Sequence, residues 1–207
     1  MNLHRFRSAF AATDGVPPPL PINRDFGVPG LDTLLNELGG QSMNQGLYRV
    51  IKPDQVAAAT LAMEAVFPEY RGRIVPFGFD WLGRHFACDF KRVESGHPLV
   101  LMLEVGVGEA MEIPSTLLDF HNVELVDYID DVLATSFWRN WRTLNPAELT
   151  FNDCVGYKVP LFLGGVDVVE NLERIDLNLY VELCGQLRNR ALTLPQGQCI
   201  RNLTFCG

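Results

Sequence analysis

The stretch Ile-Val-Pro-Phe-Gly-Phe-Asp-Trp-Leu-Gly-Arg-His-Phe-Ala-Cys-Asp-Phe, residues 74–90, decides the fold class of this chain. Two apolar runs, residues 74–79 and 84–90, flank the turn residues Asp80-Trp81-Leu82-Gly83. Short runs rich in β-branched and aromatic residues around such a turn predict a β-hairpin. In the second run alternate residues are expected on opposite faces, which indicates a half-buried strand. Trp81 at the turn is expected to fold back onto the core.

Further strands and helices are predicted on both sides of this hairpin. Strands are expected at residues 46–51, 98–105 and 110–113, the second of them covered on both faces because it is nearly all apolar. Apolar residues at helical spacing predict helices at residues 3–12, 31–38, 53–67 and 122–141. Because the strands follow one another through hairpins, we predict an α+β fold. Its mainly antiparallel sheet is flanked by helices, and a smaller C-terminal subdomain contains a helix.

The segment Asp153–Gly165 and the polar run after it are patterned differently from the rest of the chain. Val159–Leu163 is apolar, and Pro160 limits any strand there to a sheet edge or a bulge. Gly164-Gly165 predicts a turn, because glycine adopts positive φ without steric cost. From Asp176, a predicted N-cap, apolar residues at helical spacing predict one more helix. We expect this segment to present a surface.

Charge is unevenly distributed along the chain. Residues 1–103 carry ten acidic and ten basic side chains, whereas residues 104–207 carry fifteen acidic and seven basic ones, which accounts for the net charge of −8. No Lys or Arg occurs from Gly96 to Trp138. In the helix predicted at 122–141, four carboxylates are expected to point away from the core: Glu124, Asp127, Asp130 and Asp131. Direct nucleic-acid binding is not expected, because phosphate contacts require basic patches. A basic protein is the natural partner, and the alternative is an acidic face that only aids solubility.

Composition places the chain among ordinary globular proteins. Its 207 residues are 47% hydrophobic, with a mean hydropathy of +0.07. The apolar run that follows His4-Arg5-Phe6-Arg7 is too short for a signal peptide, and no apolar stretch is long enough to span a membrane. Five cysteines without a Cys-x-x-Cys pair predict reduced thiols and a cytoplasmic protein, although Cys199 and Cys206 are close enough in sequence to pair.

No motif in the sequence completes a catalytic or metal-binding constellation. Gly106-Val107-Gly108 lacks the third glycine of a phosphate-binding loop, and the acidic residues after it would repel phosphate. The least implausible enzyme site combines Cys154, His121 and the carboxylates within residues 167–176. A buried thiol and a solvated loop explain these residues more simply. We therefore expect no catalytic residue, no metal and no cofactor.

The last third of the chain resembles the C-terminal domain of bacterial Tdi-type immunity proteins. The resemblance is carried by Gly156-Tyr157-Lys158-Val159-Pro160-Leu161-Phe162-Leu163-Gly164-Gly165, Asp167, Asn171-Leu172-Glu173, Asp176, Tyr180 and Gln186. Upstream, three stretches resemble landmarks of the GAD-like module that precedes this domain: Phe26-Gly27-x-Pro29, Gly46-Leu47-Tyr48-Arg49 and Phe77-Gly78-x-Asp80-Trp81-Leu82-Gly83-Arg84. Val181 departs from the pattern, because relatives tend to place Trp after the tyrosine.

The resemblance implies a cytoplasmic antitoxin, related in kind to SUKH-type immunity proteins, that binds a contact-delivered toxin and has no catalytic residues. Such toxins are often type VI secretion effectors with DNase activity. It also implies a GAD-like module at residues 1–115 and an immunity domain at residues 116–207, packed as one unit. An acidic inhibitor suits a basic nuclease, so the predicted partner-binding residues are carboxylates: Glu109, Glu112, Glu124, Asp127, Asp130, Asp131, Asp167 and Glu170.

Two other functions remain open from the sequence alone. The first is a non-catalytic regulatory or scaffold protein without a toxin partner. The second is a small-molecule enzyme that uses the site around Cys154. A monomer and a weak dimer are both compatible with the sequence, and no membrane contact is expected.

Overall fold

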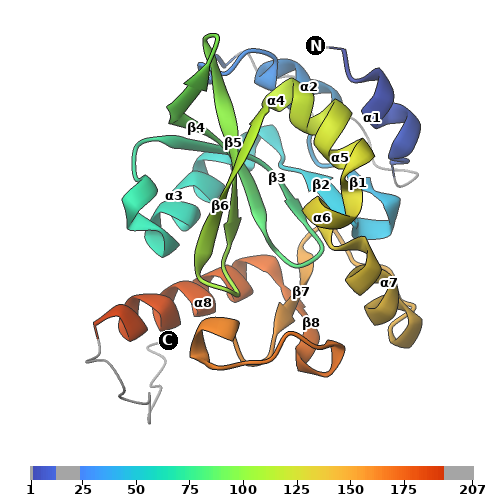
Figure 1. Ribbon diagram of the computed structural model, residues 1–207, viewed down its shortest axis with the longest axis vertical. Helices are drawn as coiled ribbons and strands as arrows, with labels where there is room; N and C mark the ends of the chain where they lie inside the picture. Colours follow the sequence, from blue (N-terminus) through green and yellow to red (C-terminus); the bar gives the residue numbers. More distant parts are fainter. Residues whose placement is uncertain (1, 13–23, 194–207) are drawn as a thin grey trace.

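The computed structural model describes residues 2–12 and 24–193. Cys199 and Cys206 lie outside these residues, and so does the disulfide considered as an alternative for them. Within them, six strands form one antiparallel sheet in chain order (Figure 1): β1 Ser42–Met43, β2 Tyr48–Val50, β3 Ile74–Asp80, β4 His85–Glu94, β5 His97–Glu104 and β6 Glu109–Thr116. A second antiparallel sheet pairs β7 Asp153–Tyr157 with β8 Leu172–Asp176. The predicted α+β fold with a mainly antiparallel sheet is confirmed.

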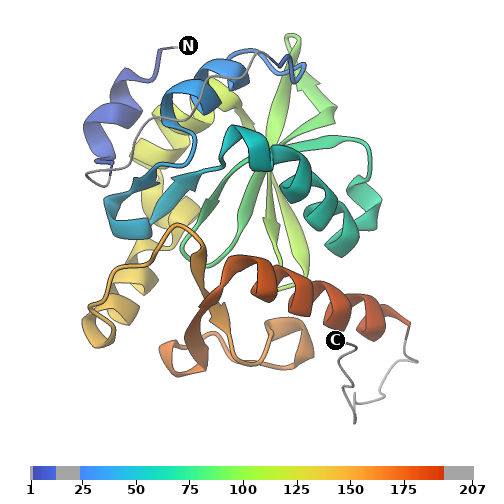
Figure 2. The same cartoon turned by 180° about the vertical axis from the view of Figure 1, so that it is seen from behind.

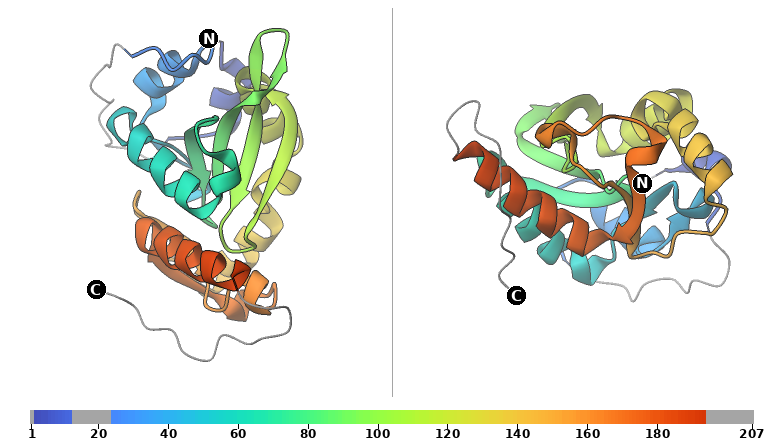
Figure 3. Two further views of the ribbon diagram at one scale, coloured as in Figure 1. Left: turned by 90° about the vertical axis from the view of Figure 1, so that its left-hand side faces the viewer. Right: turned by 90° about the horizontal axis from the view of Figure 1, so that it is seen from below.

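Helices cover both faces of the six-stranded sheet. Their bounds are α1 His4–Ala9, α2 Leu31–Leu38, α3 Val56–Val66, α4 Leu117–Asp119, α5 Leu125–Asp127, α6 Ile129–Leu133, α7 Thr135–Leu144 and α8 Leu177–Leu192. In the left view of Figure 3 the sheet lies between α3 on one side and the chain from α4 to α7 on the other. Figure 2 shows α2 and α3 on the near face, with α8 below α3. The short helices predicted near the N-terminus, at 31–38 and at 53–67 are confirmed.

The second strand of the central hairpin is more deeply buried than its alternation indicated. His85 to Asp89 are all buried, and exposure begins only at Phe90, which is 39% exposed. Because helices cover both faces of the sheet here, the alternating polar residues of β4 are buried and do not face solvent. The prediction of a half-buried strand is therefore wrong for this part of β4. The doubly covered strand predicted at 98–105 is confirmed, since Val100 to Leu103 are buried.

The long helix predicted at residues 122–141 is broken into several pieces. A π-helical turn at Phe120–Glu124 is followed by α5, α6 and α7. Ala134, between α6 and α7, has a φ of 49°, in the left-handed region that ends a helix. The spacing of apolar residues therefore predicted the buried positions correctly. It was wrong in predicting one continuous helix. The longest described helix is instead α8, with 16 residues.

The C-terminal unit, residues 153–192, contains a hairpin that the sequence analysis did not predict. The apolar run Val159–Leu163 forms no strand and includes a short 3-10 helix at Leu161–Leu163, and Gly164 turns the chain with a φ of 87°. The strands β7 and β8 flank this turn. The predicted cap is confirmed, because the side chain of Asp176 accepts a hydrogen bond from Leu179 N at 3.0 Å. The predicted apolar stripe of α8 is buried: Leu177, Tyr180, Val181, Cys184 and Leu187.

The hairpin tips of the large sheet, residues 80–84 and 105–108, meet the C-terminal unit in a contact that we call the joint. Val155 N in β7 donates to the carbonyl oxygen of Trp81 at 2.7 Å, and Leu161 N donates to that of Gly106 at 2.9 Å. These two bonds tie the C-terminal unit to both hairpin tips. One cluster of buried apolar side chains runs through the sheet and this unit. The division at residues 115 and 116 stays a prediction.

Tyr180 fills the centre of the joint. Its hydroxyl oxygen accepts a hydrogen bond from Tyr157 N at 3.2 Å. A Cβ on Gly106 would lie 2.3 Å from that oxygen, and a Cβ on Gly156 would lie 2.5 Å from the Tyr180 ring. Real Cβ atoms do not approach other atoms so closely, so both positions require glycine.

The turn at residues 80–84 is held by buried polar contacts. The Asp80 carboxylate accepts hydrogen bonds from the backbone N–H groups of Leu82 and Arg84 and from Arg84 Nε. The Arg84 guanidinium also donates to Val132 O, and Trp81 Nε1 donates to Leu133 O, each at 2.8 Å. Trp81 is fully buried, which confirms the predicted fold-back onto the core. The Asp-Trp-Leu-Gly-Arg landmark thus has a structural role, because it connects the sheet to α6.

Candidate functional site

A groove runs between α3 and α8 on the face of the molecule shown in Figure 2. Its volume is about 480 Å³. Small residues of α3, Ala58, Ala59 and Ala62, form one wall, and Val181 and Gly185 of α8 contribute to the other. Such a volume lies within the usual range of about 300–1,000 Å³ for ligand pockets. We call this hollow the α3–α8 groove.

The two walls are in contact where the C-terminal end of α3 meets the second half of α8. A Cβ on Gly185 would lie 2.9 Å from a Val66 methyl group, so the helices approach closely there. Arg188 of α8 then donates to Gly108 O at 2.8 Å and to Val66 O at 2.6 Å, and its guanidinium lies over the Phe67 ring. These contacts hold α8 against both α3 and the sheet. The groove extends from this contact toward Ala58.

His85 and two aromatic rings form the floor of the groove. The His85 side chain is stacked on Phe79 with ring centroids 5.7 Å apart, and Phe151 meets Phe79 edge-on at 5.5 Å. His85 Nδ1 lies 3.0 Å from Gly83 O. A carbonyl only accepts, so Nδ1 carries the hydrogen and Nε2 is left as an acceptor. Burial lowers the pKa of His85 to about 4, so the ring is neutral at neutral pH.

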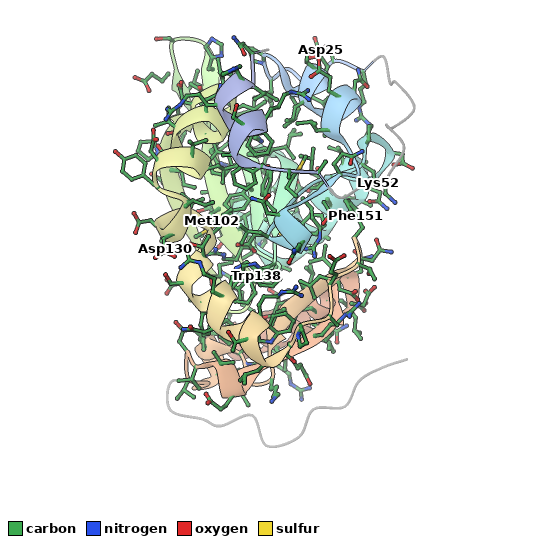
Figure 4. All side chains as sticks on the ribbon, turned by 90° about the vertical axis from the view of Figure 1, so that its right-hand side faces the viewer. Asp25, Lys52, Met102, Asp130, Trp138 and Phe151 are labelled. Carbon is green, nitrogen blue, oxygen red and sulfur yellow. The ribbon has the colours of Figure 1, made fainter. Side chains whose placement is uncertain are left out.

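The rim of the groove is polar and rich in primary amides. Side chains of this type line it on both sides: Gln55, Asn152, Asn178, Gln186 and Asn189. Glu182 is the one charged side chain among the described residues that line the groove, and Gln186 Nε2 donates to its carboxylate at 3.1 Å. Lys52 lies outside the lining, with Nζ 4.9 Å from the centre of the Phe151 ring; Figure 4 shows this pair on the side opposite Asp130.

The predicted partner-binding carboxylates are spread over three parts of the molecule. Glu109 and Glu112 lie on β6, at the edge of the large sheet. Glu112 is paired with Arg92 at 3.3 Å, and its side chain is 64% exposed. Asp167 and Glu170 lie before β8, where Asp167 accepts a hydrogen bond from the Tyr157 hydroxyl at 2.7 Å.

The four carboxylates predicted on one helix lie on three separate helical segments. Glu124 is half-buried and accepts a hydrogen bond from Ser115 Oγ at 2.5 Å. Asp127 forms an ion pair with Arg5 of α1 at 2.6 Å, which lowers the pKa of Asp127. Asp130 caps α7: bonds from Thr135 Oγ1 and from Ser136 hold its pKa below its ordinary value.

Asp131 is the exception within this group. It is exposed, and its carboxylate makes no hydrogen bond or ion pair with any other described residue. Asp127, Asp130 and Asp131 are exposed, as predicted, but the single helix expected to carry them is wrong, because it breaks at Tyr128 and Ala134.

The residues of the alternative enzyme site lie apart. Cys154 is buried next to Gly83 and Tyr180, and burial raises the pKa of its thiol well above the usual value. His121 lies between Tyr48 and Phe6, where its two ring nitrogens meet the Tyr48 hydroxyl and Leu117 O. No group of three metal-ligating side chains occurs within residues 2–12 and 24–193.

The α3–α8 groove was not predicted from the sequence. The available signal was the high alanine content of residues 57–65. Alanine side chains are short, so they leave space beside the helix, but they keep its apolar pattern. Small residues on a helix also occur where another helix packs closely, so this signal alone does not distinguish an open groove from a tight contact. Val181, the position that departs from the family pattern, lines the groove.

Comparisons with known proteins identify the C-terminal part of the chain. Residues 137–188 match the family model described as "T6SS immunity protein Tdi1, C-terminal". This segment is therefore similar to the C-terminal domain of that immunity-protein family, and the match covers about a quarter of the chain. The match includes most of α7, the β7–β8 sheet and most of α8, and so contains the Tyr180 side of the joint and one wall of the groove.

The fold as a whole is similar to a solved structure, described as "Crystal structure of Atu4351 from Agrobacterium tumefaciens". The TM-score is 0.58 at 14% sequence identity, and the similarity covers 89% of each chain. An identity this low supports a shared fold and no more. No curated protein matches the sequence. None of the described helices has the length and apolar character needed to cross a membrane.

Proposed function

We propose that this chain is an immunity protein that binds and neutralises a cognate toxin of a type VI secretion system. The observation that carries the proposal is the family match at residues 137–188. Neutralisation is by stoichiometric binding in the cytoplasm and uses no catalysis, cofactor or membrane. This agrees with the buried, neutral state of Cys154 and His121.

The charge distribution supports a nuclease as the toxin. A nuclease requires a basic surface for the phosphate backbone, and an acidic inhibitor can occupy that surface. The exposed carboxylates of Asp131, Glu109 and Glu170 are available for such contacts. Glu112, Glu124, Asp127, Asp130 and Asp167 add negative charge on the same half of the sequence, although each also has a partner within the fold.

Growth rescue tests the proposed function directly. The protein encoded by the neighbouring large gene is expressed in a sensitive cell with and without this chain, and the two proteins are co-purified. We expect rescue and a one-to-one complex. Continued toxicity in the presence of this chain, or a harmless neighbour, would contradict the proposal and favour a regulatory or scaffold role.

Charge reversal tests the acidic contribution to binding. Asp131→Lys should slow association with the toxin by about three- to tenfold at low salt, because complementary charge accelerates encounter. Glu94→Lys is the matched control, since Glu94 is exposed on β4 in the charge-balanced half of the sequence and changes net charge equally. Equal association rates for both variants would show that Asp131 does not lie at the interface with the toxin.

A further inference from the structure

We propose that the α3–α8 groove binds an extended segment of the toxin, which places apolar side chains against the alanines of α3 and a basic side chain beside Glu182. The proposal rests on the proposed function, because the toxin is the occupant. It assigns the groove a role separate from that of the exposed carboxylates on β6 and α6.

The shape of the groove suits side chains of an inserted segment. Ala58, Ala59 and Ala62 are exposed or half-buried, and open space lies in front of them. Apolar side chains that enter this space would leave water and contact Val181 and Phe79. The contact of Gly185 with Val66 keeps the helices from closing the groove further.

The floor of the groove contains a hydrogen-bond acceptor. His85 lines the groove, and its Nε2 is an acceptor because Nδ1 donates to Gly83 O. A donor that enters the groove can therefore pair with this nitrogen. A backbone N–H group of an inserted segment supplies such a donor.

The primary amides of the rim can form hydrogen bonds with a polypeptide backbone. Primary amides donate and accept at once, as peptide groups do, so they pair with an extended chain whatever its side chains are. Asn178 and Gln186 lie on α8, Asn152 lies at the start of α8, where its carbonyl oxygen accepts from Leu177 N, and Gln55 lies directly before α3. This arrangement gives donors and acceptors along both sides.

The negative charge at the rim of the groove favours a bound segment with a basic side chain. Glu182 is exposed, and among the described residues no basic side chain lines the groove. A lysine or arginine of the bound segment would therefore meet a carboxylate without a competing cation. This preference agrees with a basic nuclease as the toxin.

Two neighbouring alanines provide the test. Ala57 and Ala58 are both exposed on α3, but only Ala58 lines the groove. The full chain is titrated against a nuclease-inactive form of the toxin encoded beside it. Ala58→Trp should weaken binding by about tenfold or more, because the indole fills the groove, whereas Ala57→Trp should bind as the unchanged protein does. Both variants are first checked for an unchanged melting temperature.

A second pair tests the charge preference. Glu182→Lys should weaken binding several-fold, and Glu173→Lys, an exposed position outside the groove, should not. The ¹⁵N resonance of His85 Nε2 should also shift on addition of the toxin, since its lone pair then accepts a hydrogen bond. An unchanged resonance together with unchanged binding of Ala58→Trp would overturn the proposal.

The outcomes separate this inference from the proposed function. If the unchanged protein does not bind the toxin, the proposed function fails. If it binds and both tryptophan variants bind equally well, only the assignment of the groove fails. If Ala58→Trp instead converts a dimer of the free chain to a monomer, the occupant is a second copy of this chain and the inference is overturned.

Discussion

The joint and the α3–α8 groove both lie where the C-terminal unit meets the rest of the chain, but they are packed in opposite ways. At the joint, Gly106 and Gly156 leave no space for a Cβ beside Tyr180. In the groove, alanines face a hollow of about 480 Å³. One helix, α8, contributes to both. The difference indicates that the joint fixes the position of α8, so that the groove keeps its shape without being filled.

The largest expected effect is the loss of Trp81 from the joint. Trp81→Ala should lower the free energy of unfolding by about 3–5 kcal/mol, because a fully buried indole is removed and Leu133 O loses its donor. Denaturant titration measures the change. Trp81→Phe, which keeps much of the ring contact, should cost clearly less. A loss below about 1 kcal/mol for Trp81→Ala would show that the joint does not hold the fold together.

The two buried histidines make stability depend on pH. Burial lowers the pKa of both His85 and His121 to about 4, below an unfolded value of about 6.5. The unfolded chain therefore binds more protons as the pH falls from about 6.5 toward 4, and stability decreases over that window. Between pH 7 and pH 5 each histidine should account for a loss of about 2 kcal/mol.

The variant His121→Gln isolates one of these contributions. His121 is sealed in the core, whereas His85 faces the groove. The drop in stability between pH 7 and pH 5, measured by denaturant titration, should be smaller in the variant by about 2 kcal/mol. An identical drop would mean that His121 is not held neutral in the folded protein.

A methyl group at the tightest point of the joint should have the next largest effect. Gly106→Ala should destabilise the protein by about 1–3 kcal/mol, because the new Cβ overlaps the Tyr180 hydroxyl. In a Tyr180→Phe background the same substitution should cost less, since the overlapping oxygen is gone. Thermal unfolding of the four proteins in this cycle gives the coupling. Additive losses would contradict direct contact.

The smallest expected effect belongs to the groove. Ala58→Trp should change the free energy of unfolding by less than about 0.5 kcal/mol, because Ala58 is exposed and its side chain supports no buried contact. The same variant is expected to weaken toxin binding. A loss of stability comparable to that of Gly106→Ala would show that the groove is part of the packed structure and would remove the contrast with the joint.

The sequence predicted those parts of the fold that depend on local pattern. The hairpin around Asp80–Gly83, the helix at Leu31–Leu38 and the Asp176 cap follow from apolar period, turn residues and capping chemistry. The break at Ala134 was not predictable from its residue type, because alanine favours helix interiors and rarely adopts the left-handed φ found here. Burial of β4 on both faces likewise depends on which helices cover the sheet.

The candidate sites differ in the same way. A run of carboxylates is visible in the sequence, but whether Glu124 or Asp130 is free for a partner depends on neighbours such as Ser115 and Thr135. The α3–α8 groove is formed by helices that are more than a hundred residues apart in the chain. No local sequence pattern can therefore predict the space between these two helices.

Hydrogen exchange of the backbone amides, with and without the nuclease-inactive toxin, distinguishes a rigid joint from a groove that the toxin fills. Slow exchange reports hydrogen bonds that are protected from opening. We expect new protection in Ala58–Ala62 and Asn178–Glu182 when the toxin binds, while the joint residues around Gly106 and Tyr180 are already protected and do not change. Unchanged exchange along the groove, or loss of protection at the joint on binding, would show that the groove does not bind the toxin or that the joint is not rigid.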